Sequence, residues 1–195
     1  MGLSTPALLQ QVLAQRVKKN VTDSDLTPAA VLLLLYCKEG SYHVLLNKRS
    51  ELVEHHKGEI SFPGGARDPV DRDFLDTALR ETEEEMGVKR GDVTILGELD
   101  DIVTRSNFGV RVYVGTIPYP YPFKPSQDEI AEVLEVPLSV LQDPANLRQD
   151  ARWVDNKLIT SYAYACGEHL VFGATATILE QFLDLLGQVP QQRGG

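Results

Sequence analysis

Apolar residues recur at helical spacing in three parts of the chain. They predict an N-terminal helix over residues 4–19, a central helix over 72–86 and a final amphipathic helix over 175–186. The central helix is expected to stop at Gly87, because glycine adopts the left-handed conformation that often follows a helix without steric cost. The three helices are therefore well separated in the sequence.

Runs of apolar and β-branched residues between these helices predict strands. Strands over residues 30–36 and 42–48 flank a turn that contains glycine, which indicates a hairpin. A short strand over 59–62 leads into a proline-glycine-glycine turn, and a further strand over 161–165 stays open. The remaining expected strands lie over 94–99, 110–117 and 132–136. This mixture, without regular βαβ alternation, predicts an α/β fold of the α+β type: a mixed sheet sandwiched between helices.

Length, composition and charge fit one globular domain. We expect a single domain over residues 1–195, with its core over 28–187 and a flexible tail over 188–195. A net charge of -9 argues against a nucleic-acid or anionic-membrane surface. The apolar run over 29–36 is too short to cross a bilayer. We therefore expect no nucleic-acid and no membrane partner.

The two cysteines and the N-terminal residues indicate the cellular compartment to expect. Cys37 and Cys166 form no CxxC pair and cannot build a disulfide framework, so reduced thiols are expected. The first residues show no basic leader and no cleavage site of small residues, which makes a cytoplasmic protein the default expectation. Whether the chain forms a homodimer stays open, since nothing in the sequence decides it.

The central helix carries an unusual group of carboxylates. Glu81, Glu84 and Glu85 follow i, i+3 and i+4 spacing, and we expect them on the face opposite the apolar residues of the helix. Like charges at these spacings repel one another by some tenths of a kcal/mol per pair. A hard divalent cation with oxygen ligands would convert that repulsion into coordination. A solvated acidic face is the alternative interpretation.

The glycines before this helix favour the metal site. Gly64 and Gly65 end a short strand, and glycine lets a backbone pass close to a metal ion or a phosphate. A lone glycine pair would indicate only a tight turn. The glycine loop, the acidic helix and the terminal Gly87 at fixed offsets form a much rarer combination.

These residues together resemble the Nudix box, the pattern G-x5-E-x7-R-E-U-x-E-E-x-G-U with U apolar. Residues 80–88, RETEEEMGV, match its second half, with Thr82 in place of the apolar residue. Counted from Gly65, the first acidic position is Asp71, and eight rather than seven residues separate it from Arg80. This insertion resembles the branch of the Nudix superfamily that hydrolyses coenzyme A and related compounds.

The preceding segment resembles the additional motif of that branch, LLTxRSxxxRxxxGxxxFPGG. Residues 45–50 (LLNKRS) and 56–65 (HKGEISFPGG) follow it. Asn47 stands where threonine is usual, and Glu54 stands where the family carries an arginine. The second departure reverses a charge, so it bears directly on recognition of coenzyme A.

Two later segments extend the resemblance over most of the chain, from about residue 32 to residue 182. Residues 172–176, FGATA, are similar to the WGATA segment of the branch. Residues 128–138 resemble its DEV…EV..VPL region. The resemblance implies a Nudix fold.

The resemblance also implies a metal site and a reaction. Glu81, Glu84 and Glu85 are expected to bind Mg²⁺ or Mn²⁺, with the carbonyl oxygen of Gly65 as a further candidate ligand. Bound ions would polarise a pyrophosphate and activate water, which would attack phosphorus without a covalent enzyme intermediate. Arg80 is expected to orient Glu81 or a neighbouring carboxylate, because a guanidinium pairs with carboxylates in a fixed fork.

Substrate contacts and the general base are assigned as candidates. Arg49 and Lys48 are candidates for substrate phosphates, and strand alternation predicts that only one of them faces the site. Gly64 and Gly65 are candidates for close backbone approach to the substrate. A box glutamate, Glu84 or Glu85, is one candidate base. The loop carboxylates Asp128 and Glu129 are others, and an exposed turn acid is their alternative role.

Three hypotheses on function follow. The first is hydrolysis of coenzyme A or acyl-coenzyme A to 3',5'-ADP and 4'-phosphopantetheine or its acyl form. The second is the same chemistry on ADP-ribose, NADH, a dinucleoside polyphosphate or a nucleoside triphosphate, which the charge at Glu54 keeps open. The third is a non-catalytic nucleotide-binding regulator, which the retained box carboxylates disfavour.

Overall fold

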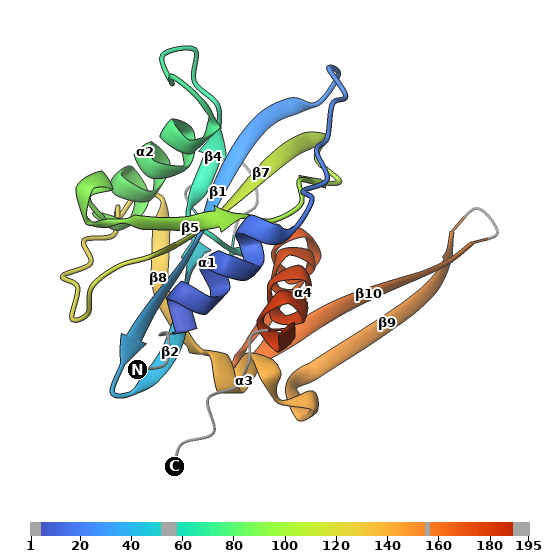
Figure 1. The fold of residues 1–195 in the computed structure, drawn as a ribbon. Coiled ribbons are helices and arrows are strands. Elements are labelled where there is room, and N and C mark those ends of the chain that lie inside the picture. The colour runs from blue at the N-terminus through green and yellow to red at the C-terminus, as the bar shows by residue number, and fades with distance from the viewer. Residues whose placement is uncertain (1–4, 52–57, 155–156, 189–195) are drawn as a thin grey trace.

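The computed structural model describes residues 5–51, 58–154 and 157–188 (Figure 1). Its helices are α1 (Thr5–Gln15), α2 (Phe74–Met86), α3 (Leu138–Gln142) and α4 (Gly173–Gln188), with the 3-10 turns η1 (Arg90–Asp92) and η2 (Pro144–Asn146). Its strands are β1 (Thr27–Lys38), β2 (Ser41–Arg49), β3 (Ile60–Ser61), β4 (Gly64–Ala66), β5 (Thr94–Glu98), β6 (Ile102–Val103), β7 (Phe108–Thr116), β8 (Ile130–Pro137), β9 (Leu147–Val154), β10 (Lys157–Cys166) and β11 (His169–Val171).

The main sheet is mixed and is organised around β1. Its central order is β3-β2-β1-β7-β5, with β4 paired to β1, β6 to β7 and β8 to β2. Strand β1 runs parallel to β7 and antiparallel to β2, as the predicted hairpin requires. The first part of β1 pairs with β4, through Ala29–Ala66 and Val31–Gly64, and its last part pairs with β2. This change of partner brings the glycine turn beside the middle of the sheet.

Helices cover both faces of this sheet, as predicted. Leu33 and Leu35 of β1 belong to a core formed with α1 and α4, whereas Leu32, Leu34 and Tyr36 belong to a core formed with α2. Figure 1 shows α2 on one side of the sheet and α1 with α4 on the other. The continuous apolar run of β1 follows from this arrangement, because a strand buried on both faces has no polar side.

A second sheet contains β11, β10 and β9 in that order. The strand left open over 161–165 is part of β10, and β9 was not predicted. Figure 1 shows the β9–β10 hairpin extending away from the main sheet. Contacts of α4 and α3 with β10 connect its base to the rest of the molecule.

Two predicted helix ends need correction. Helix α2 begins at Phe74 rather than residue 72, because the Asp73 side chain accepts a hydrogen bond from the Asp76 N–H and caps the helix. Its end is as predicted: Gly87 has φ 69° and donates its N–H to the Glu83 carbonyl. Helix α1 ends at Gln15 rather than residue 19. The basic residues that follow it pair with acidic groups around β5, as in Arg16–Asp100 and Lys18–Glu98.

Among the helices of the described residues, none has the length and apolar character needed to cross a membrane.

Candidate active site on helix α2

The three box carboxylates of α2 differ sharply in exposure. The Glu85 side chain is 2% exposed, that of Glu81 18% and that of Glu84 56%. The expectation that all three lie opposite the apolar face is therefore wrong. Glu85 borders the buried residues Thr82 and Met86, so the carboxylates form a row that runs from the interior to the surface.

Thr82 explains how a polar residue stands at the apolar position of the box. Its side chain is fully buried, and its hydroxyl donates a hydrogen bond of 2.6 Å to the Ala78 carbonyl one turn earlier. A buried hydroxyl costs little when it has such a partner. The departure at Thr82 is thus compatible with a packed helix.

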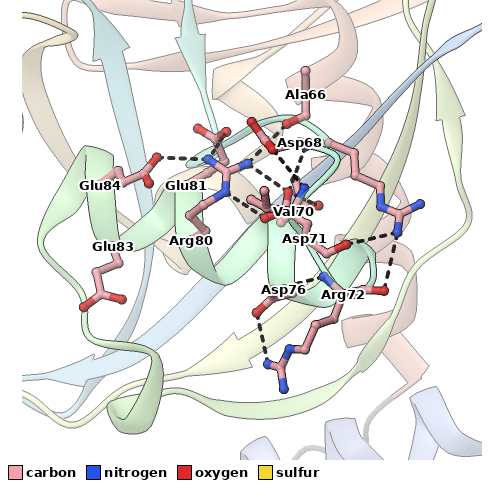
Figure 2. Close-up of polar contacts among 12 residues, drawn as sticks. Ala66, Asp68, Val70, Asp71, Arg72, Asp76, Arg80, Glu81, Glu83 and Glu84 are labelled. Carbon is pink, nitrogen blue, oxygen red and sulfur yellow. Dashed lines mark hydrogen bonds and ion pairs between the residues drawn. The ribbon is translucent and has the colours of Figure 1, made fainter.

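Arg80 joins the carboxylates of this region to one another, as Figure 2 shows. Its Nη1 lies 2.8 Å from Glu81 Oε1 and 3.0 Å from Glu84 Oε2. Its Nε and Nη2 bind the two oxygens of Asp71, at 2.8 Å and 3.0 Å. The predicted contact between Arg80 and Glu81 is present in this geometry.

Asp71 anchors the loop before α2 and holds Arg80 in place. Its buried carboxylate accepts hydrogen bonds from the Asp68 N–H and the Thr77 hydroxyl as well as from Arg80. The hydrogen bond from Arg80 is the main cause that lowers the pKa of Asp71, against the opposing effect of burial. The eight residues between Asp71 and Arg80 therefore form a turn and a helix start that bring the two charges together.

Three groups from the segment preceding the box surround the Glu85 carboxylate. The Gly64 N–H and Asn47 Nδ2 each donate to Glu85 Oε2 at 3.1 Å. Arg49 Nη1 lies 3.3 Å from Glu85 Oε1. Strand β2 and the glycine turn thus provide all of these contacts, and the two sequence motifs meet at one carboxylate.

Burial and like charges both raise the pKa of box carboxyl groups. Burial raises the pKa of Glu85 to about 7; the Gly64 N–H and Arg49 oppose this, and the charges of Glu81 and Glu129 add to it. Burial also raises the pKa of Glu81, against its hydrogen bond to Arg80 and together with the charges of Glu84 and Glu129. Negative charge is therefore concentrated at this place.

Gly64 has no room for a side chain, and a side chain at Gly65 would displace the Glu81 carboxylate. A Cβ at Gly65 would lie 2.6 Å from the carboxyl carbon of Glu81. At Gly64, where φ is 152°, a Cβ would lie 2.3 Å from the Ala30 carbonyl oxygen. The glycine turn is thus pressed between β1 and the acidic helix, where its backbone is available to the site.

Arg49 contacts the box carboxylates. Asn47 and Arg49 both reach Glu85, and the pairing of β2 with β8 is irregular between Lys48 and Arg49. That only one of the two cations faces the site stays a prediction. The Nε of Arg49 is buried without a hydrogen-bond partner among the described residues.

The loop before β8 brings Glu129 near the box. The Glu129 charge raises the pKa of Glu81 and Glu85, and its carbonyl accepts the Ser50 N–H at 2.7 Å. Asp128, the other candidate base, is exposed and contributes to neither shift. The same loop donates the Ser126 N–H to the Glu85 carbonyl and so satisfies a carbonyl in the last turn of α2.

The donor set fits a hard divalent cation in its chemistry. Carboxylate oxygens and a glycine carbonyl are the ligands that Mg²⁺ and Mn²⁺ prefer. Across residues 5–51, 58–154 and 157–188, no three acidic, histidine or cysteine side chains already converge in a metal-binding geometry. Glu81 and Glu84 pair with Arg80 instead. Arg80 contacts one oxygen of each carboxylate, Oε1 of Glu81 and Oε2 of Glu84, and a metal ion would bind the other oxygens.

Sequence reasoning missed the role of two polar residues beside the site. Asn47 appeared only as a departure from a motif, yet it is fully buried and contacts Glu85. Ser61 was not singled out, and its hydroxyl donates to Asn47 Oδ1 at 2.7 Å. A buried amide at the end of a strand that leads toward the box was the available signal. Glu54 lies outside the described residues.

Comparisons with known proteins agree with this geometry. The model of the NUDIX domain family matches residues 26–158. An uncharacterized Nudix hydrolase NudL of Photorhabdus laumondii is 36% identical over 156 residues, covering 78% of this chain and 81% of that protein. A NudL of Yersinia pestis is 31% identical over 163 residues, covering 77% of this chain and 75% of that protein.

Solved structures share the fold at low sequence identity. The Nudix hydrolase RenU of M. smegmatis has a TM-score of 0.58 at 17% identity, covering 86% of this chain and 90% of that one. The NUDIX domain of Shewanella oneidensis NrtR, solved with ADP ribose, has a TM-score of 0.53 at 19% identity, covering 90% and 97%. The family match, the relatives and the box on α2 lead to one conclusion: the chain belongs to the Nudix hydrolase family and is a pyrophosphohydrolase of nucleoside diphosphate-linked substrates.

Proposed function

We propose that this Nudix hydrolase cleaves coenzyme A or acyl-coenzyme A, with Mg²⁺ or Mn²⁺, to 3',5'-ADP and 4'-phosphopantetheine or its acyl form. The observation that carries the proposal is the contact between two motifs. Asn47, Arg49 and Gly64 come from the segment that resembles the coenzyme A branch, and all three contact Glu85 of the box. The residues behind the substrate assignment are therefore adjacent to those of the metal chemistry.

In this proposal Glu81, Glu84 and Glu85 hold the metal, with the Gly65 carbonyl as a further ligand. A bound divalent ion neutralises pyrophosphate oxygens and makes water a better nucleophile at neutral pH. Arg80 keeps Glu81 and Glu84 within reach of each other, and Asp71 fixes the guanidinium plane. Arg49, whose side chain is 24% exposed, pairs with a substrate phosphate through its guanidinium group.

Water then attacks one phosphorus of the pyrophosphate, and the bond between that phosphorus and the bridging oxygen breaks. The water proton passes to a carboxylate base, for which Glu129 is the candidate outside the box because its charge acts on both Glu81 and Glu85. The bridging oxygen leaves with the other phosphate. No covalent enzyme intermediate forms, so no nucleophilic side chain is required.

Other substrates of the same reaction class are the competing assignment. The Nudix domain of Shewanella oneidensis NrtR was solved with ADP ribose, and Glu54 reverses the charge that the coenzyme A motif carries. ADP-ribose, NADH, dinucleoside polyphosphates and nucleoside triphosphates therefore belong in the same assay. A non-catalytic regulator is disfavoured by the complete set of box carboxylates.

The test is a comparison of kcat/KM over this panel with Mg²⁺ and with Mn²⁺. The proposal expects coenzyme A or an acyl-coenzyme A to be the best substrate. A higher kcat/KM for any other compound would assign that compound as the substrate and leave the type of reaction unchanged. No detectable hydrolysis of any compound of the panel with either metal would support the hypothesis of a non-catalytic regulator.

A further inference from the structure

A chain of hydrogen bonds runs from α4 through β3 to the box carboxylate. Thr175 Oγ1 donates to the Ile60 carbonyl at 2.9 Å, and the neighbouring Ser61 hydroxyl donates to Asn47 Oδ1 at 2.7 Å. Asn47 Nδ2 then donates to Glu85 Oε2 at 3.1 Å. Thr175, Ser61 and Asn47 are not metal ligands in the proposed function, and the hydrogen bonds connect four secondary-structure elements, α4, β3, β2 and α2.

Asn47 has no freedom to turn within this chain. Its side chain is fully buried, with the amide oxygen occupied by Ser61 and the amide nitrogen by Glu85. An amide that rotated by half a turn would put its oxygen against the Glu85 carboxylate, which only accepts hydrogen bonds. Glu85 therefore determines which end of the amide faces it, and the hydrogen bond from the Ser61 hydroxyl to Asn47 Oδ1 holds the amide in that orientation.

Strand β3 needs an anchor for this role, because it has only two residues. Ile60 and Ser61 pair with Lys48 and Asn47 of β2 at the edge of the main sheet. The buried Thr175 hydroxyl binds the Ile60 carbonyl from the start of α4. This contact assigns a structural meaning to the threonine of the FGATA segment, which the proposed function did not use.

The contacts of Glu85 show that these hydrogen bonds determine which of its two oxygens can accept a further ligand. Among the described residues, Oε2 accepts from both Asn47 and the Gly64 N–H, whereas Oε1 has one longer contact, with Arg49. A carboxylate oxygen accepts about two hydrogen bonds. Asn47 and Gly64 thus occupy Oε2, and they leave Oε1 as the oxygen with acceptor capacity on the side of Arg49.

We infer that Asn47 and Ser61 are positioning residues that orient the Glu85 carboxylate for metal binding, with Thr175 fixing the strand that carries Ser61. The inference rests on the proposed function only in taking Glu85 as a metal ligand. Partners that orient a ligand commonly change metal affinity by about 10–100-fold when they are removed. If these hydrogen bonds served folding alone, removing them would lower the stability of the protein without changing the metal affinity of its folded state.

The experiment is a Mn²⁺ titration of the full chain, in which the EPR signal of the free ion reports the dissociation constant without any turnover. Ser61→Ala and Asn47→Leu remove the two inner contacts, and Thr175→Val removes the outer one while keeping a β-branched shape. Thr177→Val is the matched control, because Thr177 lies on the same helix, is exposed and donates its hydroxyl hydrogen bond to the Gly173 carbonyl of its own helix. Melting curves set a temperature at which every variant is folded.

The inference expects the Mn²⁺ dissociation constant to rise about 10-fold or more in Ser61→Ala and Asn47→Leu. A smaller rise is expected in Thr175→Val, and none in Thr177→Val. If Asn47→Leu fails to fold, Ser61→Ala decides, since it deletes one oxygen atom. Folded Ser61→Ala and Thr175→Val proteins with the parent's Mn²⁺ affinity and kcat would overturn the inference.

The two proposals fail in different ways. Glu85→Gln, titrated alongside, reports the affinity that remains without this ligand. If the parent protein binds Mn²⁺ through Glu85 but cleaves no compound of the panel, the proposed function fails. The positioning role of Asn47 and Ser61 is then still supported. If the chain cleaves coenzyme A while Ser61→Ala binds Mn²⁺ normally, only the inference fails.

Discussion

At the scale of single residues, Glu85 is the box carboxylate with the least favourable surroundings for a negative charge. It is 1% exposed, and the charges of Glu81 and Glu129 act on it. A buried carboxylate among like charges is costly unless donors or a cation compensate it. The Gly64 N–H, Asn47 and Arg49 provide part of that compensation, and the proposed metal ion provides the rest.

Replacing Glu85 tests whether it binds the metal ion or is only an acidic residue close to the site. Glu85→Gln keeps the shape and an acceptor oxygen but loses the charge, so kcat/KM with Mg²⁺ should fall by more than the roughly 100-fold typical of outer partners. Glu83→Gln is the matched control, because Glu83 is exposed on the same helix and its side chain pairs with Arg90, at 3.4 Å. Near-normal turnover by a folded Glu85→Gln protein would show that Glu85 is not a ligand.

The pKa of Glu85 predicts how metal-free stability depends on pH. The folded-state pKa of about 7 lies above the ordinary 4.5, so the folded protein binds this proton more tightly than the unfolded chain does. Stability is therefore lost as pH rises from about 4.5 to 7, by an amount on the order of 3 kcal/mol. Urea unfolding with a chelator at pH 5 and pH 7.5 measures it, and Glu85→Gln should lack this component. An equal pH dependence in both proteins would contradict the assignment.

Glu54, which lies outside the described residues, is the departure from the resembling motif that tests the substrate assignment. Glu54→Arg restores the cation of the resembling motif, and a cation near a phosphate-rich substrate should raise kcat/KM for coenzyme A. We expect the gain to appear mainly as a lower KM. The check is a pair of kinetic assays, one with coenzyme A and one with ADP-ribose. An unchanged kcat/KM for coenzyme A would show that this position does not contact the substrate.

At the scale of elements, α2 depends on the loop that precedes it. Asp71 binds Arg80 through both oxygens and also accepts from Asp68 and Thr77, so one carboxylate connects the loop with two turns of the helix. Because the pKa of Asp71 is lowered, its contribution to stability is present above the ordinary value near 3.8 and is lost as pH falls below it. At neutral pH the ion pair is fully formed.

Asp71→Asn tests this connection. The substitution leaves Arg80 without its main partner in a partly buried position, and we expect a loss of about 3 kcal/mol in the free energy of unfolding. Activity should fall as well, because Arg80 then no longer has a fixed orientation toward Glu81. Asp184→Asn, at an exposed position on α4, is the control for both measurements. A stability change below about 1 kcal/mol in Asp71→Asn would refute the anchoring role.

Sequence patterns predicted the elements whose burial is regular and missed those whose pairing is long-range. The strands β1 and β2 and the helices α2 and α4 were expected close to their observed bounds. Strand β9, with the sequence LRQDARWV, carries polar and charged residues without alternation, and its pairing with β10 defines it as a strand. The burial of Glu85 was missed for a related reason. Helical spacing reports the face of a residue, but strand β2 and the glycine turn that cover Glu85 come from elsewhere in the chain.

At the scale of the whole molecule, the sheet brings distant segments to one place. Strand β1 pairs with β2, β4 and β7, so the motif on β2 and the glycine turn at β4 both lie beside α2. The box carboxylates and Glu129 would repel an anionic substrate, and bound cations would neutralise that charge locally. Fold and charge together thus make metal dependence the central claim for this Nudix hydrolase.

The most direct measurement of that claim is identification of the products formed from coenzyme A in water labelled with heavy oxygen, with Mg²⁺ or Mn²⁺ and with a chelator. The account predicts equal amounts of 3',5'-ADP and 4'-phosphopantetheine, one labelled oxygen on the phosphate that water attacked, and no products in the chelator. Cleavage that persists in the chelator, or products without the label, would contradict metal-dependent attack of water on the pyrophosphate.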